Sequence, residues 1–160
     1  MDGSMHGALT DILNDYEQRR SQEIAARKAE LASVDKFLAG ATTALQSVVA
    51  PCFEQFAQAL KKHNHECTIE TQELNPDDSR CDVSIALTIF PDGTELPQGN
   101  ASLSYIASSH RQRVSAHRSI TTRGGGLIPG TIGEYQLTEI TRALVDQDLL
   151  EIARAVFGTR

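Results

Sequence analysis

Tryptophan is absent from this sequence, and aromatic residues make up only 5% of its 160 positions. The only cysteines are Cys52, Cys67 and Cys81. A small and odd number of cysteines does not form the disulfide framework of a small secreted domain. No apolar run approaches the roughly 20 residues that cross a bilayer, and the N-terminus lacks the basic segment and apolar core of a secretory signal. We therefore expect a cytoplasmic protein with no membrane partner.

Motifs for catalysis and for cofactor binding are equally scarce. There is no Gly-x-Ser-x-Gly motif, and the run from Gly125 to Thr131, which resembles a phosphate loop, lacks the lysine that such a loop requires. His63, His65 and Cys67 alternate as metal ligands on an extended segment would, but no fourth ligand has comparable spacing. We predict no catalytic residue, no metal and no cofactor. Because active sites also assemble from distant residues, an enzyme stays open as an alternative.

The main feature that is present is a long run, from residue 8 to residue 63, with the pattern of a helix. From Ile24 onward, apolar residues recur every seven positions in two series that form a narrow seam, which is typical of a helix packed against another helix. Arg27 interrupts the second series. The first series is Ile24, Leu31, Leu38, Leu45 and Cys52, and the second is Val34, Ala41 and Val48. We predict a homo-oligomer, with a dimer favoured, that associates through Ile24, Leu31, Val34, Leu38, Ala41 and Leu45.

Two residues within this run disturb a regular helix. Gly40 costs a helix about 1 kcal/mol relative to alanine, and Pro51 removes a hydrogen bond and clashes with the preceding turn. A straight helix over residues 8 to 63 would span roughly 80 Å, whereas a compact chain of this size has a radius of gyration of about 15 Å. The run therefore either folds back as a hairpin near Gly40 or projects its first half and buries the seam against another subunit.

The first turns of the run carry a separate apolar patch, formed by Leu9, Ile12, Leu13 and Tyr16. Such a patch is typical of a docking peptide that binds a groove on a partner. The alternative is that the patch packs on the sheet of its own chain or on a second copy. We expect residues 1–7 to be disordered.

After His65 the pattern changes to the alternation of β-strands. We predict strands over residues 66–74, 82–90, 101–109 and 113–122, followed by a glycine-rich loop, Gly124 to Gly130, and a short edge strand over 131–135. A final helix over 139–157 would begin at the N-cap Thr138 and end at Gly158.

The expected fold class is α+β. It comprises a long N-terminal helix that is kinked or broken near Gly40 and Pro51, a four- to five-stranded antiparallel meander, and a C-terminal helix packed on the sheet. Residues 8–63 would form a helical arm, and residues 64–160 the sheet and the last helix of a single domain.

Charge is distributed unevenly along the predicted sheet. Residues 63–109 contain one basic and eight acidic residues, a balance of −7, whereas residues 110–125 contain four arginines and no acid. Arg111, Arg113 and His117 share one parity on the fourth strand, so an anion or a partner could contact them beside the glycine-rich loop. The full candidate set is Arg111, Arg113, His117, Arg118 and Arg123. A net charge of −6 opposes an approach to phosphate, so we expect no nucleic-acid partner.

Together these features favour a non-enzymatic module that binds a protein partner, of the adaptor or chaperone-like kind, and that self-associates through its N-terminal helix. The alternative is a protein that binds a small ligand or an anion, or an enzyme, with a groove between the sheet and the C-terminal helix near the arginine-rich strand and the glycine-rich loop.

Overall fold

The structure is a computed structural model, and it describes residues 2–72, 82–93, 101–121 and 127–158. The helices are α1 (Asp2–Ala44), the π-helical turn η1 (Leu45–Val49), α2 (Ala50–Lys61) and α3 (Arg142–Phe157), and the 3-10 turns are η2 (Pro91–Gly93) and η3 (Leu137–Glu139). The strands are β1 (Glu66–Gln72), β2 (Val83–Phe90), β3 (Ala101–Ser108), β4 (Arg113–Thr121) and β5 (Leu127–Tyr135). This order confirms the predicted α+β fold class.

The chain divides into two compact units, Met1–Lys36 and Phe37–Arg160. The first unit is helical from Asp2 onward, including residues 2–7, for which the sequence predicts disorder. The second unit contains the end of α1 and all the elements that follow. Residues 37–61, the second half of the predicted arm, therefore belong to the unit that contains the sheet.

Helix α1 passes through Gly40 without interruption, so the hairpin considered for this position is wrong. The glycine instead allows a close approach to η3. A Cβ atom at position 40 would lie only 2.9 Å from Cδ1 of Leu137. Because glycine has no Cβ atom, the backbone of α1 can lie close to the Leu137 side chain without this clash.

The irregularity in the helical run comes at η1, directly before Pro51. The Ala50 amide donates to the carbonyl of Leu45, five residues back, as in a π-helix. In a regular helix the ring of Pro51 would clash with the carbonyl four residues before it. The wider π turn relieves that conflict, and Pro51 then lies in the first turn of α2, where no amide donor is needed.

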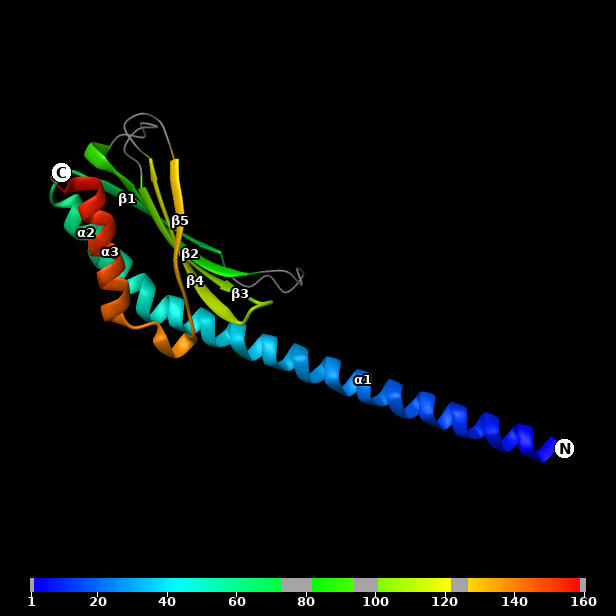
Figure 1. The fold of residues 1–160 in the computed structure, drawn as a ribbon. Helices are drawn as coiled ribbons and strands as arrows, with labels where there is room; N and C mark the ends of the chain where they lie inside the picture. Colours follow the sequence, from blue (N-terminus) through cyan, green and yellow to red (C-terminus); the bar gives the residue numbers. More distant parts are fainter. Residues whose placement is uncertain (1, 73–81, 94–100, 122–126, 159–160) are drawn as a thin grey trace. The chain divides into compact units, whose positions relative to one another are not determined.

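The five strands form one antiparallel sheet in the order β1-β2-β3-β4-β5 (Figure 1). Along β2 and β3, buried and half-buried residues alternate without a break, as predicted. Strand β5 begins at Leu127, four residues before the predicted start, and its pairing with β4 has a bulge between Ala116 and His117. Residues 127–130 of the predicted loop are therefore strand, whereas Cys81 and residues 124–126 lie outside the described residues.

Helices cover one face of the sheet. Helix α2 contacts β1, and α3 contacts β3, β4 and α2, beside which it lies in Figure 1. The core between the layers contains the odd-numbered residues of β2 and β3, Val114 and Ala116 of β4, and helical residues such as Phe53 and Ile152. The opposite face, which we call the open face, carries the half-buried, even-numbered residues of β2 and β3.

Helix α3 begins at Arg142, three residues after the predicted start, because Thr141 and not Thr138 is its N-cap. The Thr141 hydroxyl accepts a hydrogen bond from the Leu144 amide at 3.3 Å, and this satisfies one of the free amides of the first turn. Thr138 lies within η3 instead.

Candidate functional site

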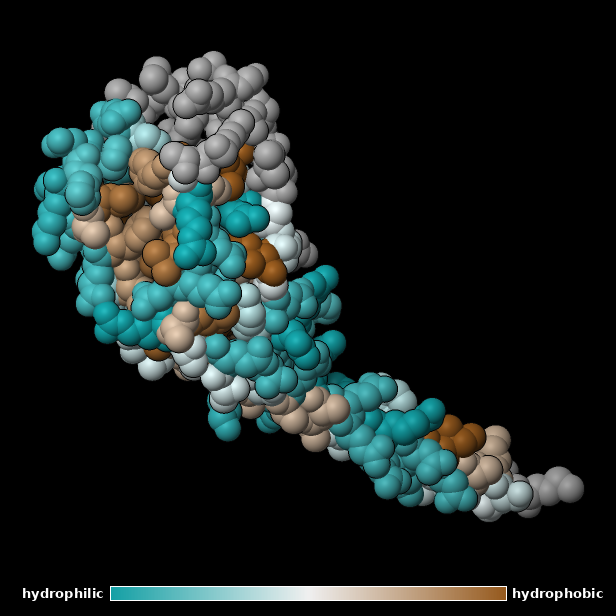
Figure 2. Space-filling view, turned by 60° about the vertical axis from the view of Figure 1, so that its left-hand side comes forward, coloured by the Kyte–Doolittle hydropathy of each residue, from teal (hydrophilic) through white to brown (hydrophobic). Residues whose placement is uncertain are grey.

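The first unit carries exposed apolar side chains along one side of its helix. At 3.6 residues per turn they fall within about a third of the helix circumference. We call this set the arm stripe, and its members are exposed by 48% to 71%. They are Met5, Leu9, Ile12, Leu13, Tyr16, Ile24 and Leu31. Figure 2 shows apolar patches along this helix within a hydrophilic surface.

Charged residues lie in the same third of the circumference, near the middle of the arm stripe. They are Arg20, Glu23, Arg27 and Glu30, all exposed, and their charges alternate in sign along the helix. This side of the helix is therefore apolar towards its two ends and charged around Ile24.

The residues predicted to mediate self-association are divided between the two units. Ile24 and Leu31 of the first unit are exposed by 49% and 58%, and Val34 is half-buried. Leu38, Ala41 and Leu45 of the second unit are exposed by only 7%, 0% and 2%. Because the last three already belong to the core of their own chain, we no longer assign them to self-association.

The first arginine of the predicted anion site is already paired. Arg111 lies in the turn before β4, and its guanidinium forms an ion pair and a hydrogen bond with Glu134 of β5. Both side chains are accessible to solvent, so the pair contributes up to about 1 kcal/mol to stability. Its more important effect is to compensate the charge of Arg111 at the place where an anion was expected to bind.

The other members of the predicted anion site point in two directions. Arg113 and His117 alternate with the buried Val114 and Ala116, so they lie on the open face, away from α3. His117 places Nδ1 3.3 Å from the hydroxyl of Thr131.

Arg118 pairs with the buried Leu103 across the sheet and therefore lies on the face that the helices cover. Arg123 is outside the described residues. The predicted groove between the sheet and α3 is thus not lined by Arg113 and His117, and the structure does not bring the predicted set together.

A buried polar pair that the sequence analysis missed joins α3 to β3. The Tyr105 hydroxyl donates to Oδ2 of Asp148 at 2.5 Å, and the two residues are exposed by 0% and 4%. Burial raises the pKa of Asp148, and the hydrogen bond from Tyr105 and the charge of Arg118 oppose that effect. Burial also raises the pKa of Tyr105. Because the core encloses both groups, the pair holds α3 on the sheet and is closed to a substrate.

The sequence did contain a signal for this pair. Asp148 lies four residues from both Leu144 and Ile152, on the apolar side of the predicted last helix. A carboxylate at such a position needs a buried donor, and a tyrosine on the apolar side of a strand can supply one.

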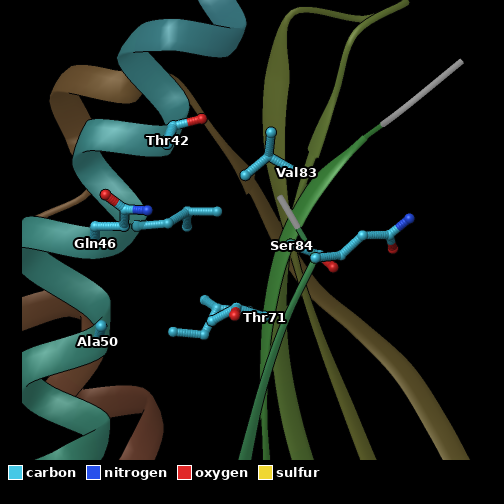
Figure 3. A pocket seen from close by; sticks show the side chains of 9 residues that line it. Thr42, Gln46, Ala50, Thr71, Val83 and Ser84 are labelled. Atoms are coloured by element: carbon cyan, nitrogen blue, oxygen red, sulfur yellow. The ribbon is translucent and has the colours of Figure 1, made fainter. Parts of the chain in front are cut away.

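Two cavities in the described part of the chain are small. An apolar cavity of ≈ 30 Å³ lies between Thr42 and Gln46 on the helical side and Thr71 and Val83 on the sheet side, and Figure 3 shows these lining residues. An open groove of ≈ 240 Å³ lies between α2 and β1; its lining residues include Lys61, His65 and Cys67. Pockets for drug-sized ligands usually hold about 300–1,000 Å³, so neither has the volume expected of such a site.

His65 and Cys67, two of the alternating residues considered as metal ligands, have other surroundings. Nδ1 of His65 accepts from the Asp92 amide at 2.9 Å, and its ring packs on that of Phe157 with centroids 4.6 Å apart. Burial raises the pKa of Cys67 to about 11, so its thiol is protonated at neutral pH. Among the described residues, no three His, Cys, Asp or Glu side chains are grouped so that they could hold a metal ion.

None of the helices in residues 2–72, 82–93, 101–121 and 127–158 combines the length with the apolar character that crossing a membrane requires. No protein-family model matches the chain, and no curated protein and no solved structure matches it significantly.

Proposed function

We propose that this chain is a non-enzymatic protein-binding module, of the adaptor or chaperone-like kind, that self-associates through the helix of its first unit in the cytoplasm. The observation that carries the proposal is the arm stripe. Seven large apolar side chains lie on one side of a helix, and about half or more of the surface of each is exposed to water.

The physical basis is that a helix alone in water has little stability. Most of the stability of protein helices comes from packing of an apolar face, and the isolated helix is marginal. Full burial of one Leu or Ile side chain contributes about 1.5–3 kcal/mol. Covering the arm stripe with a second copy would bury several such side chains in each chain, and this would stabilise both the helix and the association.

The remaining surfaces fit this role better than that of a ligand-binding protein or an enzyme. The described cavities are small, the Tyr105–Asp148 pair is enclosed, and Arg111 is compensated by Glu134. The open face is rich in Ser and Thr, with Phe90 and Ile106 as its larger apolar residues on β2 and β3. A few large side chains that become buried usually supply most of the binding energy at an interface. In this chain, exposed side chains of that kind are most numerous on the helix of the first unit.

Light scattering after size exclusion tests the proposal on the full chain. Wild-type protein should be a dimer or a larger oligomer, and Leu9→Asp/Leu31→Asp should be a monomer, because the substitutions put charge into the contact. The matched control is Ala25→Asp/Ala29→Asp, which adds the same charges on the opposite side of the helix and should leave the oligomer intact. Wild-type protein that stays monomeric at every concentration, or an oligomer that tolerates the Leu9 and Leu31 substitutions, would contradict the proposal.

A further inference from the structure

The order of charges along the arm indicates the direction in which two copies pair. We infer that the first-unit helices of two copies pair antiparallel, with their midpoint between Ser21 and Gln22, so that Arg20 of each copy faces Glu23 of the other. This inference rests on the proposed self-association and adds its direction and register.

About that midpoint the charges of the arm are complementary to one another. Arg20 faces Glu23 of the second copy. Tyr16 faces Arg27 of the second copy, where the guanidinium can lie over the aromatic ring. Two-fold symmetry repeats every one of these contacts, so the interface contains each of them twice.

The same register matches two pairs of apolar residues, whereas Leu13 is level with Glu30 and Ile24 with Arg19. Leu9 of one copy faces Val34 of the second copy, and Ile12 faces its Leu31. Leu9, Ile12 and Leu31 are exposed by 48% to 61%, and Val34 is half-buried. All four of these residues lie in the first unit, so none of them belongs to the second unit's core.

A parallel pairing in register would oppose like charges. Residues at the centre of the seam would then face their own copies, with Arg20 against Arg20 and Arg27 against Arg27. Like charges that face each other across a helical seam destabilise it, and here Arg20 and Arg27, one heptad apart, would both do so.

A second antiparallel register, shifted by seven residues, also pairs unlike charges, with Arg20 facing Glu30 and Glu23 facing Arg27. That register would place Leu9 against Ala41 of the second copy. Ala41 is fully buried in the second unit, with an exposed fraction of 0%. The shifted register brings four members of the arm stripe, Met5, Leu9, Ile12 and Leu13, level with buried residues of the second unit, whereas the register centred between Ser21 and Gln22 does so only for Met5, which is level with Leu38. This difference selects the register centred between Ser21 and Gln22.

Charge reversal on the full chain tests the pairing. Arg20→Glu creates two contacts between like charges in the antiparallel dimer and should raise the dissociation constant about tenfold. Arg20→Glu/Glu23→Arg exchanges the two charges, restores both contacts and should return the constant to within about threefold of wild type. The control Lys36→Glu makes the same charge change on the opposite side of the helix and should have little effect. In a parallel dimer, Arg20→Glu would only replace the repulsion between two arginines with a repulsion between two glutamates. A dissociation constant that is unchanged from wild type would therefore overturn the inference.

Cross-linking with a short bis-maleimide reports the direction independently. Ile12→Cys/Leu31→Cys should give a covalent dimer well above the level of the wild-type chain, which controls for the native cysteines, and each single variant should not. Efficient cross-linking of Leu31→Cys alone would show a parallel dimer and overturn the inference while leaving the proposed self-association intact. A wild-type chain that is monomeric in light scattering would overturn both.

Discussion

Asp148 is an acidic residue buried in the core of the second unit. Its carboxyl group accepts from Tyr105 inside the core, and burial makes the charged form less favourable there than in water. The folded state therefore binds a proton at Asp148 more tightly than the unfolded chain does. The contribution of this group to stability is largest below the ordinary pKa of about 3.8, and it falls as the pH rises through the raised value.

Asp148→Asn should remove this pH dependence. The amide oxygen can still accept from Tyr105, and no charge is left to desolvate. The free energy of unfolding of the variant, relative to wild type, should therefore increase as the pH is raised from about 4 to about 7. Urea denaturation at these two pH values measures it. A difference between variant and wild type that is constant or shrinks with pH would contradict the raised pKa.

Tyr105→Phe serves as the control for the same pair. It keeps the ring in the core but removes the donor, so a buried carboxylate loses its partner and the protein should lose about 1–3 kcal/mol at neutral pH. Together the two variants separate the effect of the charge from the effect of the hydrogen bond.

Among the elements, α1 and η3 approach each other closely at Gly40. Glycine within a helix costs about 1 kcal/mol relative to alanine, but a Cβ atom here would lie 2.9 Å from Cδ1 of Leu137. We predict that Gly40→Ala brings little gain in wild type and stabilises the Leu137→Ala background by about 1 kcal/mol. A double-mutant cycle measured by urea unfolding checks this coupling, and purely additive effects would show that Leu137 does not restrict position 40.

For the whole molecule, the division into two units predicts that the second unit determines the stability of the fold and the first unit determines self-association. The residues of the core all lie at position 37 or beyond. A chain that lacks residues 1–33 should therefore keep a cooperative unfolding transition, with a free energy of unfolding at low concentration within about 0.5 kcal/mol of the full chain, and it should be monomeric. Circular dichroism and light scattering measure the two properties on the same sample. A truncated chain that still forms a dimer would place the association in the second unit.

Several features of the candidate site depend on tertiary contacts, which the spacing of apolar residues along the sequence does not reveal. The heptad seam runs through Ile24, Leu31 and Leu38, yet the first two are exposed and the third is buried. The spacing of the three is the same, and only the packing of the second unit distinguishes them. Likewise, parity placed Arg113 and His117 on one face correctly, but the ion pair of Arg111 with Glu134 depends on the position of β5, whose start the sequence put four residues late.

The sequence by itself determined the kind and the order of the elements, because helix and strand periods, proline and glycine act over a few residues. It yielded the long helical run with the apolar patch of its first turns, the antiparallel meander and the last helix. Only the tertiary structure decided where the run passes from exposed helix to core, at residues 36 and 37, and that Tyr105 meets Asp148. Those outcomes depend on which segments far apart in sequence cover each other, and no local pattern contains that information.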